Sequence, residues 1–297
     1  LRTMRPFLAF PKAMLSGPLL RLQPYSCSFA RYSTSLKPAI TSKPPRFYID
    51  ALDYKIHVEI VGNGPRPVVL LPGAIGSTRT DFAPQLEKLN KQLFTIIAWD
   101  PPGYGFSRPP ERTFPVDFYH RDARVLAEVL HKMGHKQYSV VGWSDGANTG
   151  MILAAMYPER IQKLVAFGGN AFVTEHDVQL LEATRNIDKW SEKMRASMEA
   201  MYGTEHFRQL WSRYCDFYQD ILHKNHGEVC RKELPLIRCP TLVVQGGKDP
   251  LVPMHHALYL LQHIAKAKLY LVPDGKHNLH FKYADEFNKV VTEFLIS

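Results

Sequence analysis

Long apolar stretches and cysteines are scarce in this sequence, and each shortage argues against a class of protein. No run of about 18 apolar residues occurs in the 297-residue chain, so no membrane span is expected. The cysteines have no paired spacing, which argues against a disulfide framework and a zinc site. No other metal-ligand set is found, so we expect neither a metal nor another cofactor. The four cysteines are Cys27, Cys215, Cys230 and Cys239.

Acidic residues are absent before Asp50. Residues 1–46 carry eight lysines and arginines and are rich in serine, leucine and proline, which is typical of mitochondrial presequences. Arg31 lies just before Tyr32 and Ser33 and resembles a processing site, which predicts a presequence of about residues 1–32. A cytoplasmic protein with a disordered basic tail is the alternative. A secretory signal is disfavoured because no clean apolar run precedes a small-residue cleavage site.

Beyond residue 46 the charges nearly balance. The chain has 37 basic and 28 acidic residues, a formal charge of +9. Without the eight cations of the first segment, 29 basic residues face 28 acidic ones. No basic stripe remains that would indicate a nucleic-acid partner. The length and the 45% hydrophobic content suit one large α/β domain with an insert. We expect the protein to be a monomer.

Short and almost continuous apolar runs recur along the rest of the chain. The segment 47–61 alternates like a hairpin, and the later runs indicate strands buried on both faces, as in a parallel sheet. Stretches with helical periodicity separate them, which predicts a mostly parallel, doubly wound α/β sheet. The predicted strands are 68–71, 94–99, 138–141, 164–167, 241–244 and 269–272, and the predicted helices are 117–133, 145–157, 254–263 and 284–295.

Residues 172–236 break this alternation because they contain no run typical of a buried strand. Their large apolar residues, such as Leu180, Trp190 and Phe217, recur at helical spacing. We therefore predict a helical lid over the carboxyl edge of the sheet, with most of its aromatic residues forming the lid's own core. The predicted divisions are 1–46 for the presequence or tail, 47–171 and 237–297 for the two parts of the α/β core, and 172–236 for the lid.

Ser144 lies in a Gly-Trp-Ser-Asp-Gly segment, residues 142–146, between a predicted strand and a predicted helix. Gly-x-Ser-x-Gly at such a junction is typical of a nucleophile elbow, in which small residues relieve crowding and leave the serine hydroxyl exposed. The amides at the start of the helix favour developing negative charge. The pentapeptide alone arises by chance, but its position predicts that Ser144 is a nucleophile.

A serine hydroxyl needs a base to take its proton and an acid to orient that base. Asp249 follows the predicted strand 241–244, and His277 follows the predicted strand 269–272. Active-site loops of open α/β sheets gather at the carboxyl ends of strands, and the order Ser, Asp, His matches that of the α/β-hydrolase fold. We therefore predict Ser144, Asp249 and His277 as a catalytic triad.

Other histidines receive a different interpretation. His280 is a rival base, but it lies at the start of a predicted helix and is interpreted as a structural or rim residue. The remaining histidines, including the neighbours His255 and His256 and the pair His131 and His135, are interpreted as surface residues.

Acyl transfer also needs two backbone N–H donors for the oxyanion. Asp145 supplies one because it directly follows the nucleophile. The second is expected from the loop after the strand 68–71, where Ala74 is the first choice and Ile75 the second. With these donors, Ser144 would attack a carbonyl, His277 would move the proton, and water would release the acyl-enzyme.

Several segments resemble those of the biphenyl hydrolase-like proteins, a family of serine hydrolases with the α/β-hydrolase fold. The similarity runs from about residue 47 to the end, lid included. Pro102 departs from it, since many members have arginine there. The resemblance implies hydrolysis of α-amino-acid esters, including nucleoside-analogue prodrugs, with Asp145 binding the substrate's α-amino group. The segments concerned are 71–73, 100–110, 142–146, 248–253 and 275–280.

Electrostatics give this role of Asp145 independent support. A carboxylate beside the nucleophile opposes the developing oxyanion, by roughly 4 kcal/mol for two charges about 4 Å apart at an effective dielectric near 20. A substrate ammonium group would offset that repulsion. We therefore expect a small-molecule ester with a free amino group. The alternative is that Asp145 points away and caps the helix.

Three other activities compete with this interpretation. Hydrolases of carbon–carbon bonds in aromatic ring-cleavage products use nearly the same fold and triad, but their acidic substrates conflict with Asp145. A general carboxylesterase or thioesterase also fits. Epoxide hydrolases and dehalogenases need an aspartate nucleophile, which Ser144 excludes. A binding protein on the same scaffold is disfavoured because such proteins usually lose part of the triad.

Overall fold

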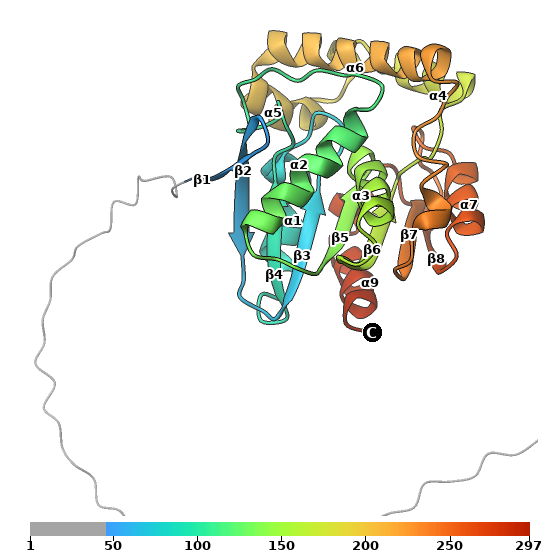
Figure 1. Cartoon of the computed structure of the whole chain (residues 1–297). Coiled ribbons are helices and arrows are strands. Elements are labelled where there is room, and N and C mark those ends of the chain that lie inside the picture. Colours follow the sequence, from blue (N-terminus) through green and yellow to red (C-terminus); the bar gives the residue numbers. More distant parts are fainter. Residues whose placement is uncertain (1–45) are drawn as a thin grey trace, which may run out of the picture. The chain divides into compact units, whose positions relative to one another are not determined.

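The computed structural model describes residues 46–297, so the predicted presequence lies outside the described residues. The described part contains an eight-stranded sheet with helices packed on both of its faces (Figure 1). Within it, none of the helices combines the length and the apolar character needed to cross a bilayer. The doubly wound, mostly parallel α/β architecture expected from the sequence is confirmed.

The strands of the sheet follow the order β1-β2-β4-β3-β5-β6-β7-β8. The pairs β1–β2 and β2–β4 are antiparallel, and every later pair is parallel. Each predicted strand is present, and the predicted hairpin forms the antiparallel edge. The bounds are β1 Phe47–Ala51, β2 Tyr54–Val61, β3 Arg66–Leu71, β4 Phe94–Trp99, β5 Tyr138–Trp143, β6 Ile161–Phe167, β7 Thr241–Gly246 and β8 Ala267–Val272.

The central strands are buried on both faces, as their continuous apolar sequences require. In β3, Val69 and Leu71 join one apolar cluster, whereas Val68 and Leu70 join another on the opposite face. The first cluster includes α2 (Phe118–Lys132), α3 (Asp145–Met156) and α7 (Met254–His263), and the second includes α1 (Thr78–Lys88) and α9 (Ala284–Ile296). The predicted helices 117–133, 145–157, 254–263 and 284–295 are all present, with small shifts at their ends.

Outside the lid, two helices lie beyond the helix ranges predicted from the sequence. The short α8 (Leu279–Lys282) precedes α9. The longer α1 has weak helical periodicity and contains Pro84. Its backbone is kinked at Phe82, whose angles are non-helical. A capping box between Ser77 and Thr80 starts α1, which satisfies amides that the first turn leaves free. This start fixes the loop that follows β3.

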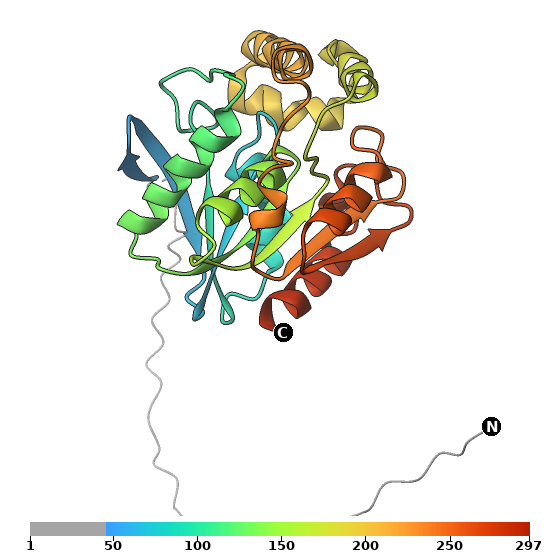
Figure 2. The ribbon, with the colours of Figure 1, turned by 45° about the vertical axis from the view of Figure 1, so that its right-hand side comes forward.

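The lid (residues 172–236) contains α4 (Glu175–Glu182), α5 (Glu192–Tyr202) and α6 (Thr204–Lys224). Both ribbon views place these helices at one end of the sheet (Figures 1 and 2). An isolated antiparallel bridge joins Phe172 to Glu228, close to the two ends of the lid. Of the α6 aromatic residues, Phe207 and Trp211 pack on Trp190 within the lid, whereas Phe217 packs on Phe118 and Tyr119 of α2.

Candidate active site

Ser144 lies at the sharp turn between β5 and α3, where the sequence predicted an elbow. Its backbone angles are φ +53° and ψ −120°, which are strained for a residue with a side chain. The Ser144 amide donates to the carbonyl oxygen of Phe167 at 2.9 Å. A Cβ atom at Gly142 would overlap the Gly146 carbonyl, and one at Gly146 would overlap the Leu71 carbonyl. The two glycines therefore allow α3 to pack closely enough to form the turn.

The structure brings Ser144, His277 and Asp249 into one hydrogen-bonded chain. His277 Nε2 lies 3.1 Å from Ser144 Oγ, and His277 Nδ1 lies 2.9 Å from Asp249 Oδ2. The other Asp249 oxygen accepts hydrogen bonds from the amides of Leu251 and Val252 at 2.9 and 3.0 Å. Burial alone would raise the pKa of Asp249, but His277 and these amides hold that pKa below its usual value. An ionised Asp249 thus orients the imidazole toward Ser144.

His280, the rival base, is fully buried on the other side of Trp143. Its Nε2 atom lies 2.8 Å from the backbone oxygen of Asp81, and Trp143 packs between the two histidines, with ring-centroid distances of 5.4 Å to His277 and 4.5 Å to His280. Burial lowers the pKa of His280 to about 3. His280 is therefore a neutral structural residue, and the geometry favours His277 as the base.

The loop after β3 forms a tight turn beside Ser144, here called the oxyanion turn (residues 73–76). The amide of Gly76 donates to the oxygen of Gly73 at 3.1 Å, and the amide of Gly73 donates to Asp81 Oδ2 at 2.8 Å. A Cβ atom at Gly73 would lie 3.4 Å from the Ser144 Cβ. Among residues 46–297, no backbone acceptor is found for the amides of Ala74 and Asp145, whereas the amide of Ile75 donates toward the hydroxyl of Tyr104. The structure thus leaves Asp145 and Ala74, the first choice, available as donors beside the nucleophile.

Asp145 is 5% exposed, and its carboxylate contacts tyrosines rather than helix amides. Tyr119 from α2 and Tyr214 from the lid each donate to Asp145 Oδ1 at 2.7 Å. Oδ2 has no hydrogen-bond partner in the described part of the chain. Burial raises the pKa of Asp145 to about 6, although the two tyrosine hydrogen bonds oppose the rise. The helix-cap alternative for Asp145 is not supported, because among residues 46–297 its carboxylate accepts hydrogen bonds from the two tyrosines and from no amide of α3.

Asp145 lines a small cavity of about 10 Å³. This volume is close to that of one water-sized group. Arg112 and Asp122 line the same cavity. Arg112 is engaged by two hydrogen bonds to Asp122 and one, at 2.8 Å, to the oxygen of Pro102. Arg121 also donates to Asp122, at 3.2 Å, so within residues 46–297 both guanidiniums engage Asp122 and neither donates to Asp145.

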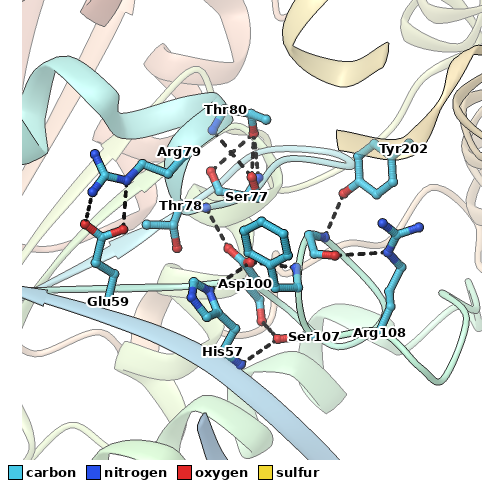
Figure 3. A network of polar contacts seen from close by, with 12 residues as sticks. His57, Glu59, Ser77, Thr78, Arg79, Thr80, Asp100, Ser107, Arg108 and Tyr202 are labelled. Atoms are coloured by element: carbon cyan, nitrogen blue, oxygen red, sulfur yellow. Dashed lines mark hydrogen bonds and ion pairs between the residues drawn. The ribbon is translucent and has the colours of Figure 1, made fainter. Parts of the chain in front are cut away.

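Asp100, at the end of β4, fixes the loops around the oxyanion turn (Figure 3). Its Oδ1 accepts from the amide of Thr78 at 2.7 Å, and its Oδ2 accepts from the amide of Phe106 at 2.8 Å. His57 Nδ1 from β2 lies 3.0 Å from the same Oδ2. Asp100 therefore joins the start of α1, the 101–110 loop and the sheet. His57 is buried, so its interpretation as a surface residue was wrong.

Asp177, His255 and His256 form the one group of potential metal ligands found among the described residues. His256 is buried and its Nε2 lies 3.0 Å from Asp177 Oδ1, so its interpretation as a surface residue was also wrong. The three residues lie in the first turns of α4 and α7, whose free amides carry partial positive charge. That charge disfavours a cation, and we interpret the group as a tie between the lid and the core.

Sequence reasoning did not predict the polar contacts of three tyrosines beside the site. Tyr119 and Tyr214 bind Asp145 from segments 95 residues apart in the chain, and Tyr202 bonds the loops beside Ser144. Each lies on an apolar helix face, where a tyrosine is indistinguishable from a core aromatic. Only the folded arrangement shows which hydroxyls meet polar partners.

Comparison with known proteins agrees with this geometry. The alpha/beta hydrolase fold family matches residues 66–197 and 172–283. Mouse serine hydrolase BPHL is 49% identical over 240 residues, which cover 81% of this chain and 82% of that protein. Human serine hydrolase BPHL is 47% identical over 241 residues, which cover 81% and 83%.

Similarity to other hydrolases is lower. A 2-hydroxy-6-oxononadienedioate/2-hydroxy-6-oxononatrienedioate hydrolase from Burkholderia vietnamiensis is 28% identical, over 86% of this chain and 96% of that protein. The meta-cleavage product hydrolase CumD from Pseudomonas fluorescens has a TM-score of 0.68 at 21% identity, over 84% of this chain and 96% of that one; this likeness shows the fold alone. The chain therefore belongs to the α/β-hydrolase fold family and, within it, to the biphenyl hydrolase-like (BPHL) serine hydrolases.

Proposed function

We propose that this serine hydrolase cleaves carboxylic esters that carry a free α-amino group, through an acyl-enzyme on Ser144. The observation that carries the proposal is the carboxylate of Asp145. It is buried directly after the nucleophile, and among the described residues one of its two oxygens lacks a partner. A buried unpaired carboxylate is unfavourable, so the site gains stability when a cation binds there.

The first half-reaction forms the acyl-enzyme. Ser144 Oγ attacks the ester carbonyl carbon while its proton moves to His277 Nε2. The oxyanion accepts hydrogen bonds from the amide of Asp145 and from that of Ala74 or Ile75. The carbon–oxygen bond to the alcohol then breaks, and the alcohol leaves with the proton from His277.

The second half-reaction hydrolyses the acyl-enzyme. His277 takes a proton from water as the water oxygen attacks the acyl carbon. The tetrahedral species collapses, Ser144 recovers its proton from His277, and the free amino acid leaves. Throughout, Asp249 accepts the hydrogen bond from His277 Nδ1 and stabilises the imidazolium form.

Amine selectivity is assigned to Oδ2 of Asp145. The tyrosine hydroxyls already occupy Oδ1, and the guanidinium of Arg112 is engaged by Asp122. The substrate ammonium group would therefore supply the missing positive charge. It would also reduce the repulsion between the Asp145 carboxylate and the oxyanion.

Paired substrates test this proposal. We expect the wild type to hydrolyse an amino-acid ester about 10 to 100 times faster, in kcat/KM, than its N-acetyl analogue, because a charged hydrogen bond contributes about 1.5–3 kcal/mol. Asp145→Asn should bring the ratio close to one. Asp216→Asn, at an exposed carboxylate of α6, is the matched control and should keep the wild-type ratio. Equal rates for the two esters in the wild type would reject amine recognition.

Carbon–carbon bond hydrolysis is the second candidate. It is favoured by relatives 25–28% identical that are named as 2-hydroxy-6-oxononadienedioate/2-hydroxy-6-oxononatrienedioate hydrolases. Dioates are dianions, and the carboxylate of Asp145 repels them. Faster cleavage of such a dioate than of any amino-acid ester would reverse the assignment. A thioester in the same panel distinguishes a general thioesterase from an amino-acid ester hydrolase.

A further inference from the structure

The oxyanion turn (residues 73–76) contains a strained residue. Ile75 has φ +51°, a left-handed conformation that is a genuine outlier for a β-branched side chain. Such conformations persist only where the surrounding contacts fix them. Asp81 holds one end of the turn through the amide of Gly73, at 2.8 Å. The carbonyl of Ile75, at the strained residue itself, is held by a different part of the molecule.

That contact comes from the lid. Tyr202, the last residue of α5, donates its hydroxyl to the oxygen of Ile75 at 2.7 Å and accepts from the amide of Gly105 at 2.9 Å. Tyr202 and Ile75 are both buried. One hydroxyl therefore connects the lid, the oxyanion turn and the 101–110 loop, and Figure 3 shows Tyr202 above that loop.

Arg108 fixes Tyr202 in this position. Its guanidinium carbon lies 4.6 Å from the centre of the Tyr202 ring. Arg108 donates to the oxygen of Gly105 at 3.0 Å and to the oxygen of Met201 at 3.2 Å. The end of α5 is thus attached to the 101–110 loop through Met201 as well as Tyr202, which aligns the hydroxyl with Ile75.

We propose that Tyr202 is a positioning residue that holds the oxyanion turn in its active conformation and so makes oxyanion stabilisation dependent on the lid. The inference rests on the proposed function, because Ala74 and Ile75 are the donors assigned there. Those amides must be aimed at the place where the oxyanion forms, and a displacement of about 1 Å can reduce rates about 100-fold. Without the hydroxyl, the oxygen of Ile75 and the amide of Gly105 both lose a buried partner.

The test is Tyr202→Phe, which removes only the hydroxyl. We expect kcat for an amino-acid ester to fall about tenfold with KM within about twofold, since donors that act on the oxyanion affect the transition state. Affinity for a phenylboronic acid, which forms a tetrahedral adduct with the serine, should fall in the same proportion. Tyr138→Phe is the matched control: Tyr138 is buried in β5, its hydroxyl has no partner among the described residues, and activity should be unchanged.

A double variant separates positioning from general destabilisation. Glycine adopts positive φ without strain, so in an Ile75→Gly background Tyr202→Phe should reduce kcat less than threefold. A tenfold loss in both backgrounds, or a loss that appears only in KM or melting temperature, would contradict the inference. The wild type is assayed first. If it shows no Ser144-dependent ester hydrolysis, the proposed function fails, whereas hydrolysis that Tyr202→Phe leaves unchanged rejects only the role of Tyr202.

Discussion

Asp145 combines the burial of a structural residue with an incomplete set of partners. Two tyrosines satisfy one carboxylate oxygen, and the other has no partner among residues 46–297. A protein selected for stability alone would favour a neutral side chain here. The retained charge is consistent with a substrate that brings its own cation.

This charge has a measurable effect on stability. The pKa of Asp145 is raised from 3.8 to about 6 by burial, so the folded state binds its proton more tightly than the unfolded state does. Its contribution to stability is therefore present at low pH and is lost as the pH rises through about 6. We therefore compare the free energy of unfolding of Asp145→Asn with that of the wild type. The difference should shift by about 1 kcal/mol in favour of the variant when the pH is raised from 5 to 8.

Urea denaturation of the two proteins at pH 5 and pH 8 measures this gain. Groups common to both proteins cancel in the difference. An unchanged difference between the two pH values would show that the pKa of Asp145 is not raised.

Sequence and structure agree at the residues whose chemistry is tied to a local motif. Ser144, Asp249 and His277 each follow a buried strand, and the parallel sheet brings those strand ends together. Tyr214 and Tyr202 have no such motif, because their polar contacts exist only after the lid packs on the core. The meeting of Ser144, Asp249 and His277 was thus predictable, and the polar contacts of the lid tyrosines were not.

At the scale of elements, the turn from β5 to α3 depends on close packing of backbones. A Cβ atom at Gly146 would overlap the carbonyl of Leu71 in β3. We expect Gly146→Ala to lower the free energy of unfolding by about 2 kcal/mol or more and to reduce kcat by displacing Ser144.

Gly150→Ala is the control on the same helix. There a Cβ atom would meet only side-chain methyl groups of Val140 and Leu164, at 3.1 and 3.3 Å, and alanine gains helix propensity. Its free energy of unfolding, from chemical denaturation, should change by less than about 1 kcal/mol. Equal effects of the two substitutions would indicate that the Leu71 carbonyl does not restrict the turn.

The elements most easily predicted were those with strong apolar patterns. Strands such as β4 and β7 contain runs of consecutive apolar residues, 96–99 and 242–244, and the hydrophobic effect buries them wherever the chain allows. The helix α1 is polar and contains Pro84, so its local preferences are weak. It forms because Phe82 and Leu86 pack on the sheet and Asp81 bonds the oxyanion turn, contacts that no local pattern reveals.

On the scale of the whole molecule, the lid is joined to the core at polar contacts far apart in the sequence. Tyr214 reaches Asp145, Tyr202 reaches Ile75, and Asp177 bonds His256. The first two lie beside the predicted nucleophile, whereas the third lies at the start of the lid. The lid is therefore connected to the predicted site by two hydrogen bonds.

The contact between Asp177 and His256 should contribute to stability. Asp177 also completes the capping box of α4 with Thr174, and we expect Asp177→Ala to lower the free energy of unfolding by about 2–4 kcal/mol. Burial alone would raise the pKa of Asp177, but His256 and Thr174 hold that pKa below its usual value. The loss of free energy of unfolding in Asp177→Ala should therefore be largest at neutral pH. It should decline as the pH falls through that lowered pKa.

Glu175→Ala provides the matched control, since Glu175 is an exposed acid in the same first turn. It should change the free energy of unfolding by less than about 0.5 kcal/mol. Denaturation at pH 7 and at a pH below 3.8, the usual pKa of an aspartate, measures both variants. Similar losses for the two, or an Asp177→Ala effect that does not shrink at low pH, would show that this contact does not fasten the lid.

The overall architecture followed from the alternation of apolar runs and helical stretches, because a parallel sheet needs helices to cover both faces. The placement of the lid helices required the structure, since their apolar faces fit many partners equally well. The mitochondrial presequence and the monomeric state stay predictions from the sequence.

The central claim is that His277 activates Ser144 as a nucleophile, and labelling with a fluorophosphonate tests it most directly. Intact-mass analysis and peptide mapping should find one adduct, on Ser144, in the wild type and none in Ser144→Ala. His277→Gln should slow labelling at least about 100-fold, whereas folded His280→Gln should label within about tenfold of the wild-type rate. A folded wild type without an adduct, or an adduct that persists in Ser144→Ala, would contradict the claim.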